Sequence, residues 1–261
     1  MYKNIGAYYI IDGQIMSSAT FKPLKGDTVI YEVLRVINGH ILFLEDHMER
    51  LQHSLGKAAV QADVKYIQEQ LLRLVSINKQ MDKNIKLDVT NGKYQLYFIE
   101  STYPKRKFYE DGVETAAVHL ERNNPTIKQL DMEYKHKIER IKGDTFFEVL
   151  LVNQQHKIIE GSSSNLLFFK KNTLYSAPLD EILTGITFQN VIKISETLGL
   201  KVTYKGVDIN QLDQMDGCFL TGTSLGVLPI KSIDHHVYDS AKQPVVLKLM
   251  QAYNALSRSM Q

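Results

Sequence analysis

The chain has 261 residues, of which 44% are hydrophobic and 23% charged, which is ordinary for a folded globular protein. Its net charge is only +2 and no long basic run concentrates it, so nothing points to nucleic acid. Cys218 is the only cysteine, which excludes an intrachain disulfide. No signal-peptide core and no apolar run of about 18 residues is present. We therefore expect a cytoplasmic protein with no membrane partner.

The first half of the chain alternates strand and helix patterns. Asp12-Gly13 and Asn38-Gly39 each lie between apolar stretches, and both pairs predict tight β-hairpins. Asp46 is expected to cap a helix whose apolar side includes Met48, Leu51 and Leu55. A second helix is predicted at 64–78, and strands at 29–37, 86–90 and 94–100.

The segment 101–112 contains Pro104, mixed charges and Gly112 without an apolar period, which is typical of a linker. We predict a small N-terminal α/β domain at 1–105, a linker at 106–114 and a larger C-terminal α/β domain at 115–261. Within the larger domain we expect strands at 115–120 and 146–152, the latter buried on both faces, and helices at 131–142 and 187–198.

Two segments of the second half carry chemistry. Glu160 and Gly161 are followed by three serines and Asn165, which offers a carboxylate among small polar residues. About twenty residues later, Gly185 and Thr187 stand where a helix is predicted to begin, and the free backbone N–H groups there favour an anion. A carboxylate and a phosphate cradle together suit a cofactor with a basic ring nitrogen and a phosphate, such as pyridoxal phosphate.

The sequence motifs of these segments resemble those of the class IV aminotransferases, which are fold-type IV pyridoxal-phosphate enzymes. E-G-S-S-S-N at 160–165, L-T-G-I-T at 183–187 and L-T-G-T at 220–223 follow one another in the family's order. The family includes D-amino acid and branched-chain aminotransferases and aminodeoxychorismate lyase. The resemblance implies a two-domain α/β (α+β) fold like that of D-amino acid aminotransferase. It also implies pyridoxal 5'-phosphate as cofactor, no metal, amino acid and oxo acid substrates, and a homodimer.

Lys128 is the catalytic residue that the resemblance implies. It lies on a short segment before a predicted helix, at the distance from the E-G motif where the family places its Schiff-base lysine. The alternative is a solvated surface lysine, a description that fits Lys135 and Lys137 better. Two departures affect its surroundings: Asp131 replaces the usual asparagine, and Tyr134 lies one place from the family's tyrosine.

The cofactor-binding residues are also carried over from the family. Glu160 would face the pyridine nitrogen and keep it protonated, unless it is a solvated turn glutamate. Arg50 lies in an H-x-x-R-L segment whose arginine reaches the phosphate in relatives; otherwise it is a snorkelling surface arginine. Thr187 could instead be an ordinary helix residue. The implied set is Arg50, Glu160, Ser164, Asn165, Gly185, Ile186, Thr187, Gly222 and Thr223.

Tyr31 and Arg35 lie in a Y-E-x-x-R segment and are the implied substrate-binding residues; otherwise they belong to a solvated strand edge. Val33 stands where known lyases carry a threonine, and it cannot transfer a proton. Asn91 replaces the arginine of the V-T-R-G segment of D-specific enzymes. The sequence thus favours an aminotransferase. The alternatives are a lyase that releases pyruvate from aminodeoxychorismate, a non-catalytic binding module and an unrelated α/β domain.

Overall fold

A computed structural model describes residues 3–79 and 81–260 of the chain. These residues form two compact units. The first contains the described residues up to 102, together with 127–130 and 257–260. The second contains residues 103–126 and 131–256. The chain therefore passes between the units more than once.

The first unit is built on a six-stranded sheet with the order β2-β1-β6-β5-β3-β4. All of its neighbouring strands are antiparallel. The strands are β1 (Tyr8–Ile11), β2 (Gln14–Ser17), β3 (Ile30–Ile37), β4 (His40–Ile41), β5 (Asn84–Thr90) and β6 (Lys93–Ile99). A short 3-10 helix, Ser18–Thr20, follows β2.

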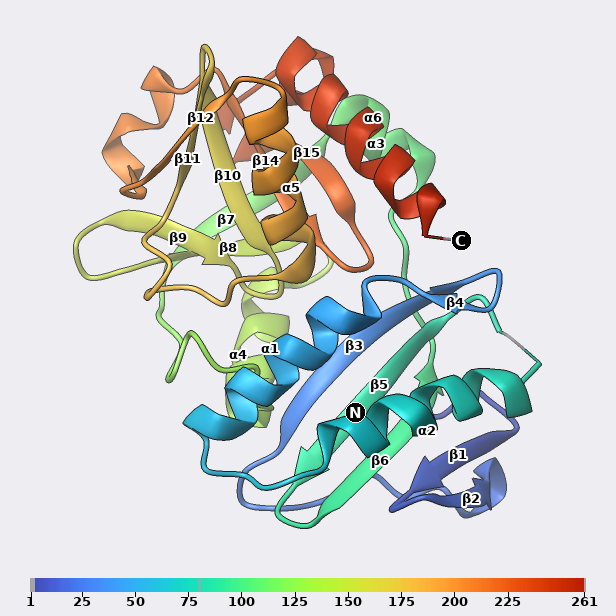
Figure 1. Ribbon diagram of the computed structural model, residues 1–261. Helices are drawn as coiled ribbons and strands as arrows, with labels where there is room; N and C mark the ends of the chain where they lie inside the picture. Colours follow the sequence, from blue (N-terminus) through green and yellow to red (C-terminus); the bar gives the residue numbers. More distant parts are fainter. Residues whose placement is uncertain (1–2, 80, 261) are drawn as a thin grey trace. The chain divides into compact units, whose positions relative to one another are not determined.

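Two amphipathic helices, α1 (Leu44–Lys57) and α2 (Val64–Ile77), pack on one face of this sheet (Figure 1). Alternate residues of β3 point toward them, so that Ile30 and Leu34 join Leu51 of α1 in the core. Glu32 lies between those two residues on the same, helix-covered face. Tyr31, Val33 and Arg35 point to the opposite face.

The short segment 127–130 extends the first unit beside β3. The backbone N–H of Tyr31 donates to the carbonyl of Lys128 at 3.0 Å, and that of Leu130 donates to Val29 at 2.8 Å. Gln129 forms an antiparallel bridge with Ile30. These backbone bonds explain why Lys128 belongs to the first unit although its flanking sequence belongs to the second.

The second unit is built on a ten-stranded mixed sheet. Its order is β12-β11-β10-β14-β15-β7-β8-β9-β13, with β16 paired to β15. The parallel pairs are β11 with β12, β15 with β7, and β7 with β8. The strands are β7 (Val113–His119), β8 (Glu148–Val152), β9 (Lys157–Gly161), β10 (Asn165–Lys170), β11 (Thr173–Ser176), β12 (Lys201–Tyr204), β13 (Val207–Asp208), β14 (Gly217–Gly222), β15 (Gly226–Ile233) and β16 (His236–Val237).

Helix α5 (Ile186–Thr197) packs against the part of this sheet that contains β12 and β14 (Figure 1). The other helices that begin in this unit are α3 (Arg106–Asp111), α4 (Met132–Lys142) and α6 (Pro244–Ser259). Two short 3-10 helices cover Ile209–Gln214 and Ser240–Lys242. No helix of residues 3–79 or 81–260 is both long and apolar enough to cross a membrane.

Most predicted elements are confirmed. At both hairpins the two turn residues have positive φ, as at Asp12 (49°) and Gly13 (79°), which is the conformation of a type I′ turn. One helix start was wrong: α1 begins at Leu44, after Phe43 in the left-handed region. Leu44 is buried in the core, and its burial makes the helix begin two residues before Asp46. Asp46 therefore lies in the first turn, where the helix dipole favours its negative charge.

The predicted linker differs in local structure. Residues 106–111 form α3. The helix ends at its C-cap, Gly112, whose backbone N–H donates to the carbonyl of Phe108, and β7 begins at the next residue, Val113. Gly112 has φ of 82°, and a Cβ there would lie 2.8 Å from the backbone nitrogen of Lys231. The glycine is therefore needed both for its conformation and for its close approach to β15.

Candidate active site

Lys128 is partly exposed and lies against an aromatic ring. Its Nζ is 4.7 Å from the ring centroid of Tyr31, a cation–π geometry. Its backbone nitrogen donates to the Ser54 hydroxyl of α1 at 3.5 Å. Lys135, by contrast, pairs with Glu139 one helical turn away on α4, and Lys137 is exposed. Of the three lysines, Lys128 is the one placed on the sheet face that also carries Tyr31.

A buried polar cluster occupies the same sheet face. Lys86 of β5 donates to Asp88 on the same strand and, at 3.3 Å, to the hydroxyl of Tyr97. That hydroxyl donates to Asp88 at 2.7 Å. The Nζ of Lys86 also lies 5.3 Å from the ring centroid of Tyr31, so two lysine amines share one aromatic neighbour. Lys86 and Asp88 neutralise each other, which makes their burial tolerable.

Arg35 lies on this face at the other end of β3. It is opposite Asn84 of β5, while Val33 is opposite Lys86 and Tyr31 is opposite Asp88. Since residues directly opposite in an antiparallel pair point to the same face, Arg35, Val33 and Tyr31 form one row beside Lys86. The row and its neighbouring strand thus place two cationic side chains, Arg35 and Lys86, on this face.

Arg50 is buried rather than snorkelling at the surface, with 8% of its area exposed. Its Nε and Nη2 donate to the two carboxylate oxygens of Glu32 at 2.8 and 2.6 Å. His47 contacts the same carboxylate through Nδ1 at 2.8 Å. The pair does not use Nη1 of Arg50, which remains the nitrogen that a phosphate could engage. The observed partner of Arg50 is thus the Glu32 carboxylate of the same unit, and its contact with a phosphate stays a prediction.

Burial and mutual electrostatic interactions determine the protonation states of Glu32, His47 and Arg50. Burial alone would raise the pKa of Glu32, but the Arg50 guanidinium and the hydrogen bond from His47 hold it well below its usual value. Burial lowers the pKa of His47, against the opposing effect of Glu32. At neutral pH the triad is therefore one carboxylate, one guanidinium and one neutral imidazole that donates through Nδ1.

Replacing Arg50 by Ala should destabilise the first unit by about 3–5 kcal/mol, because it leaves Glu32 buried without its cation. Since the pKa of Glu32 is lowered on folding, the stabilisation is fully present above the unfolded pKa near 4.5 and declines progressively as the pH falls from there toward the much lower folded pKa. Chemical denaturation of both proteins at pH 7 and pH 3.5 measures this. An equal difference between the two proteins at both pH values would contradict it.

Glu160 is buried in the second unit and is paired with an arginine. Its Oε1 accepts from Nε of Arg122 at 2.8 Å and forms an ion pair with Nη2 of the same guanidinium at 2.6 Å, and its Oε2 accepts from the backbone N–H of Leu183 at 3.3 Å. Only 3% of its side chain is exposed, so it is not a solvated turn glutamate. The guanidinium favours the charged form of the carboxylate.

The N-terminus of α5 is organised by Asn165. The Asn165 amide nitrogen donates to the carbonyl of Leu183 at 2.7 Å, and its Oδ1 accepts from the N–H of Gly185 at 3.1 Å. Gly185 is the N-cap, and no side chain caps the helix. A Cβ on Gly185 would lie 2.4 Å from the Asn165 Oδ1. The uncapped turn leaves the N–H groups of Ile186 and Thr187 available to an anion.

The remaining predicted phosphate residues lie near this turn or on the next strand. Thr187 is buried, and its hydroxyl is 3.2 Å from that of Tyr253. Gly222 ends β14 and Thr223 follows it, both partly exposed. Thr221, opposite Asn165 in β14, has a buried hydroxyl without a partner among the described residues. An orphaned hydroxyl beside an uncapped helix N-terminus fits a phosphate group.

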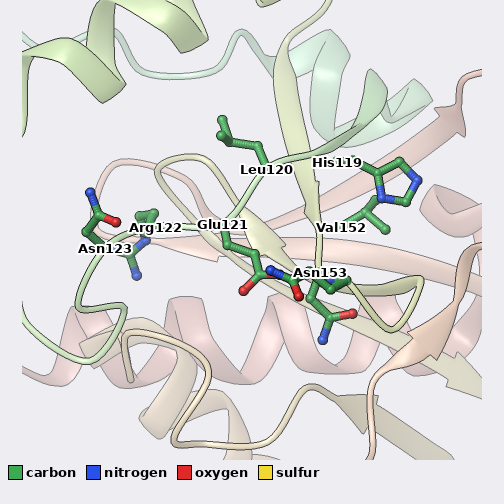
Figure 2. A pocket seen from close by; sticks show the side chains of 8 residues that line it. His119, Leu120, Glu121, Arg122, Asn123, Val152 and Asn153 are labelled. Carbon is green, nitrogen blue, oxygen red and sulfur yellow. Dashed lines mark hydrogen bonds between the residues drawn. The ribbon is translucent and has the colours of Figure 1, made fainter.

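A pocket of about 400 Å³ lies in the second unit beyond the ends of β7 and β8, and Arg122, the partner of Glu160, is one of the residues that line it. Figure 2 shows Arg122 and Asn123 on one side of it, with Glu121 and Asn153 nearby. Glu121 accepts from the backbone of Gln154 at 2.8 Å. The pocket contains none of the residues singled out from the sequence. Among residues 3–79 and 81–260, no three His, Cys, Asp or Glu side chains are grouped to hold a metal ion.

Comparison with known proteins assigns the class. The family model described as amino-transferase class IV matches residues 29–233, so the chain belongs to this family. The chain is 29% identical over 241 residues to the D-alanine aminotransferase of Bacillus licheniformis, covering 85% of this chain and 84% of the relative. The resemblance stated from the sequence is confirmed.

Solved structures show the same fold. One is the branched-chain amino acid aminotransferase from Thermobaculum terrenum in its pyridoxal-phosphate holo-form, at 23% identity and a TM-score of 0.82, covering 99% of this chain and 96% of that chain. Another is 4-amino-4-deoxychorismate lyase from Pseudomonas aeruginosa, at 20% identity and a TM-score of 0.82, covering 95% and 98%. The predicted α/β fold-type IV architecture is confirmed.

Sequence reasoning missed several residues near these sites. Arg122 was overlooked because its link to Glu160 spans 38 positions of the chain. Lys86 and Asp88 alternate on one strand and therefore share a face, a signal that was available. Asp131 proved to be the N-cap of α4, accepting from the N–H of Tyr134 at 2.8 Å. A carboxylate performs this capping as well as the family's asparagine.

Proposed function

We propose that this chain is a pyridoxal-phosphate-dependent aminotransferase that moves an amino group between an amino acid and a 2-oxo acid. The observation that carries the proposal is the buried Glu160, held by Arg122 next to the segment that leads into α5. A buried carboxylate with a cationic partner, close to an uncapped helix N-terminus, suits a ligand that has a basic nitrogen at one end and a phosphate at the other.

The residues present fit this cofactor. Glu160 would contact the ring nitrogen, while the N–H groups of Ile186 and Thr187, with Gly222 and Thr223, would hold the phosphate. The buried Thr221 hydroxyl, which has no hydrogen-bond partner among residues 3–79 and 81–260, supports an additional polar ligand there. Ser164 and Asn165 would support the site from behind, since their side chains contact Glu148 and the start of α5, respectively. Arg50 would add a charge through Nη1.

The cofactor, when bound, supplies an electron-accepting ring that stabilises negative charge at the substrate Cα. Lys128 would supply the amine that binds the cofactor covalently, and would then move a proton to and from that carbon. Lys128 is partly exposed, and its amine lies 4.7 Å from the ring centroid of Tyr31, the proposed substrate-binding residue. The pairing with Arg122 favours the charged form of the Glu160 carboxylate.

Tyr31 and Arg35 remain the proposed substrate-binding residues, on the sheet face that carries Lys128. A substrate carboxylate needs a cation, and Arg35 is the guanidinium of this strand row, whose planar group can bind a carboxylate through two hydrogen bonds. Val33 supplies no proton at the place of the lyase threonine. This supports amino transfer over elimination.

Absorption spectroscopy tests the reaction class. The purified protein loaded with pyridoxal phosphate should change its spectrum when mixed with a D- or L-amino acid, and should return to the first spectrum with an oxo acid. Pyruvate release from aminodeoxychorismate without an acceptor, and no spectral change with any amino acid, would establish the lyase instead. A protein that binds no cofactor would be a non-catalytic relative.

Replacing Arg35 by Ala should raise the substrate KM at least tenfold while the cofactor stays bound, because one charge-assisted contact is worth roughly 1.5–3 kcal/mol. Steady-state kinetics with the amino acid found above measures the change. Arg140→Ala, which alters an exposed arginine of α4, is the control and should leave KM unchanged. An unaltered KM in Arg35→Ala would move the carboxylate contact to another cation.

We also propose that the protein acts as a homodimer in the cytoplasm. The family resemblance supports the dimer, and a single buried, unpaired Cys218 is compatible with a reducing compartment. Light scattering of the purified protein at micromolar concentration should give twice the mass of 29.9 kDa. A monomer mass for a protein that still carries out amino transfer would exclude an obligatory dimer.

A further inference from the structure

Glu148 is a buried acid that the proposed mechanism does not use. It lies at the start of β8 with 3% of its area exposed. Its position falls within the strand predicted at 146–152 to be buried on both faces. No ion pair involves it within the described residues, although a buried carboxylate normally has a cationic partner. Its charge must therefore be stabilised in another way.

Four donors surround the Glu148 carboxylate, two at each oxygen. Oε1 accepts from the Ser162 hydroxyl at 2.5 Å and from the backbone N–H of Val149 at 3.0 Å. Oε2 accepts from the hydroxyls of Ser163 and Ser164 at 2.8 and 3.1 Å. A carboxylate has about four acceptor sites, so this one is saturated. Hydrogen bonds to the charged form replace the missing cation.

The three serines are consecutive, and they form the loop that joins Glu160 to Asn165. Backbone bonds close the same loop: Gly161 N–H donates to the Ser164 carbonyl at 2.9 Å, and Ser162 N–H donates to Val149 at 2.8 Å. A Cβ on Gly161 would lie 2.2 Å from the Ser164 hydroxyl oxygen. The hydroxyl of Tyr134 donates to the Ser162 carbonyl at 3.1 Å and ties α4 to the loop.

We propose that Glu148 is a positioning residue, an anionic anchor that holds the Glu160–Asn165 loop in its working conformation through three serine hydroxyls. Its importance for the cofactor rests on the proposed function. The loop begins at the carboxylate assigned to the ring nitrogen and ends at the asparagine that organises the start of α5. The buried carboxylate of Glu148 thus fixes the positions of both Glu160 and Asn165.

Negative charge, and not only side-chain volume, is essential to the anchor. Each serine has a single hydroxyl hydrogen, and all three donate to Glu148. A glutamine at this position has the same size, but its amide nitrogen can only donate. At least one serine would then lose its acceptor and face a second donor. The loop would loosen without a cavity being formed.

The test compares wild type, Glu148→Gln and the control Glu114→Gln, which alters an exposed glutamate of the neighbouring strand β7 paired with Lys231. Amide hydrogen exchange is followed by mass spectrometry without cofactor. In Glu148→Gln the amides of residues 161–164 should exchange at least tenfold faster, with little change elsewhere. Ser163→Ala, at an exposed position, should accelerate the same amides to a smaller extent.

Cofactor binding supplies the second readout. With pyridoxal phosphate, Glu148→Gln should raise the Kd at least tenfold and shift the absorption band that reports ring protonation, whereas Glu114→Gln should do neither. Unchanged loop exchange in Glu148→Gln, or faster exchange throughout the unit, would overturn the anchor. A fast-exchanging loop with an unaltered Kd and spectrum would overturn its role toward the cofactor. Failure of the wild type to bind the cofactor would overturn the proposed function but leave the exchange result standing.

Discussion

Lys128→Ala should abolish the adduct that borohydride traps between the protein and pyridoxal phosphate. The substitution removes the amine that lies 4.7 Å from the Tyr31 ring centroid. Loss of proton transfer alone should lower turnover by roughly 10²–10⁴-fold, and loss of the covalent link adds to this. The melting temperature should change little, because a partly exposed cation–π contact contributes only about 0.5–1 kcal/mol.

Peptide mapping after borohydride reduction locates the label. In the wild type it should lie on the peptide that contains Lys128, and Lys135→Ala should retain it. Lys135 is the control, since it is also a partly exposed lysine but pairs with Glu139 on α4. A label on Lys135 or Lys137 in the wild type would show that the assignment of the catalytic lysine is wrong.

Glu160→Gln should produce the second large effect, a fall in turnover of roughly 10²-fold or more. Glutamine keeps the size of the side chain but cannot stabilise a protonated ring nitrogen, and it leaves Arg122 without its anion. The loss of that buried pair should also lower stability, so turnover has to be measured well below the melting temperature of the variant. Bound cofactor should remain, held by the phosphate contacts.

Two variants separate charge from structure at this position. Glu160→Asp keeps the negative charge and should recover part of the turnover. Glu181→Gln alters a half-buried glutamate of the same unit, whose carboxylate accepts from Asn153, and should leave turnover unchanged. Equal turnover in the wild type and Glu160→Gln would remove Glu160 from the ring nitrogen.

The parts of the structure that could be predicted depend on local conformation. The Asp12-Gly13 turn is encoded by the two residues that adopt it, and the start of α5 is encoded by Gly185 and its neighbours. Contacts between distant segments were not accessible in the same way. The Arg122–Glu160 pair depends on how the segment after β7 meets strand β9, and Glu148 is a single polar residue at the start of an otherwise apolar strand.

Arg50 shows what a local motif can and cannot predict about a side chain. Its motif indicated an anion as its partner, but no local pattern could show that Glu32, 18 positions earlier, accepts from two of its nitrogens. The packing of α1 on β3 brings Arg50 and Glu32 together, and that packing depends on the whole hydrophobic core. A motif can therefore indicate that a side chain binds an anion without specifying which anionic residue or ligand it binds.

The placement of residues 127–130 has a consequence for dissecting this protein. The chain passes between its two units at 102–103, 126–127, 130–131 and 256–257. A fragment ending at residue 102 would contain all of β3 but would lose the backbone partners that Lys128 and Leu130 provide to Tyr31 and Val29. It would also expose the strand edge that they cover, which invites aggregation. The two units are therefore not separable modules: cutting the chain between them removes the lysine and uncovers the strand beside it.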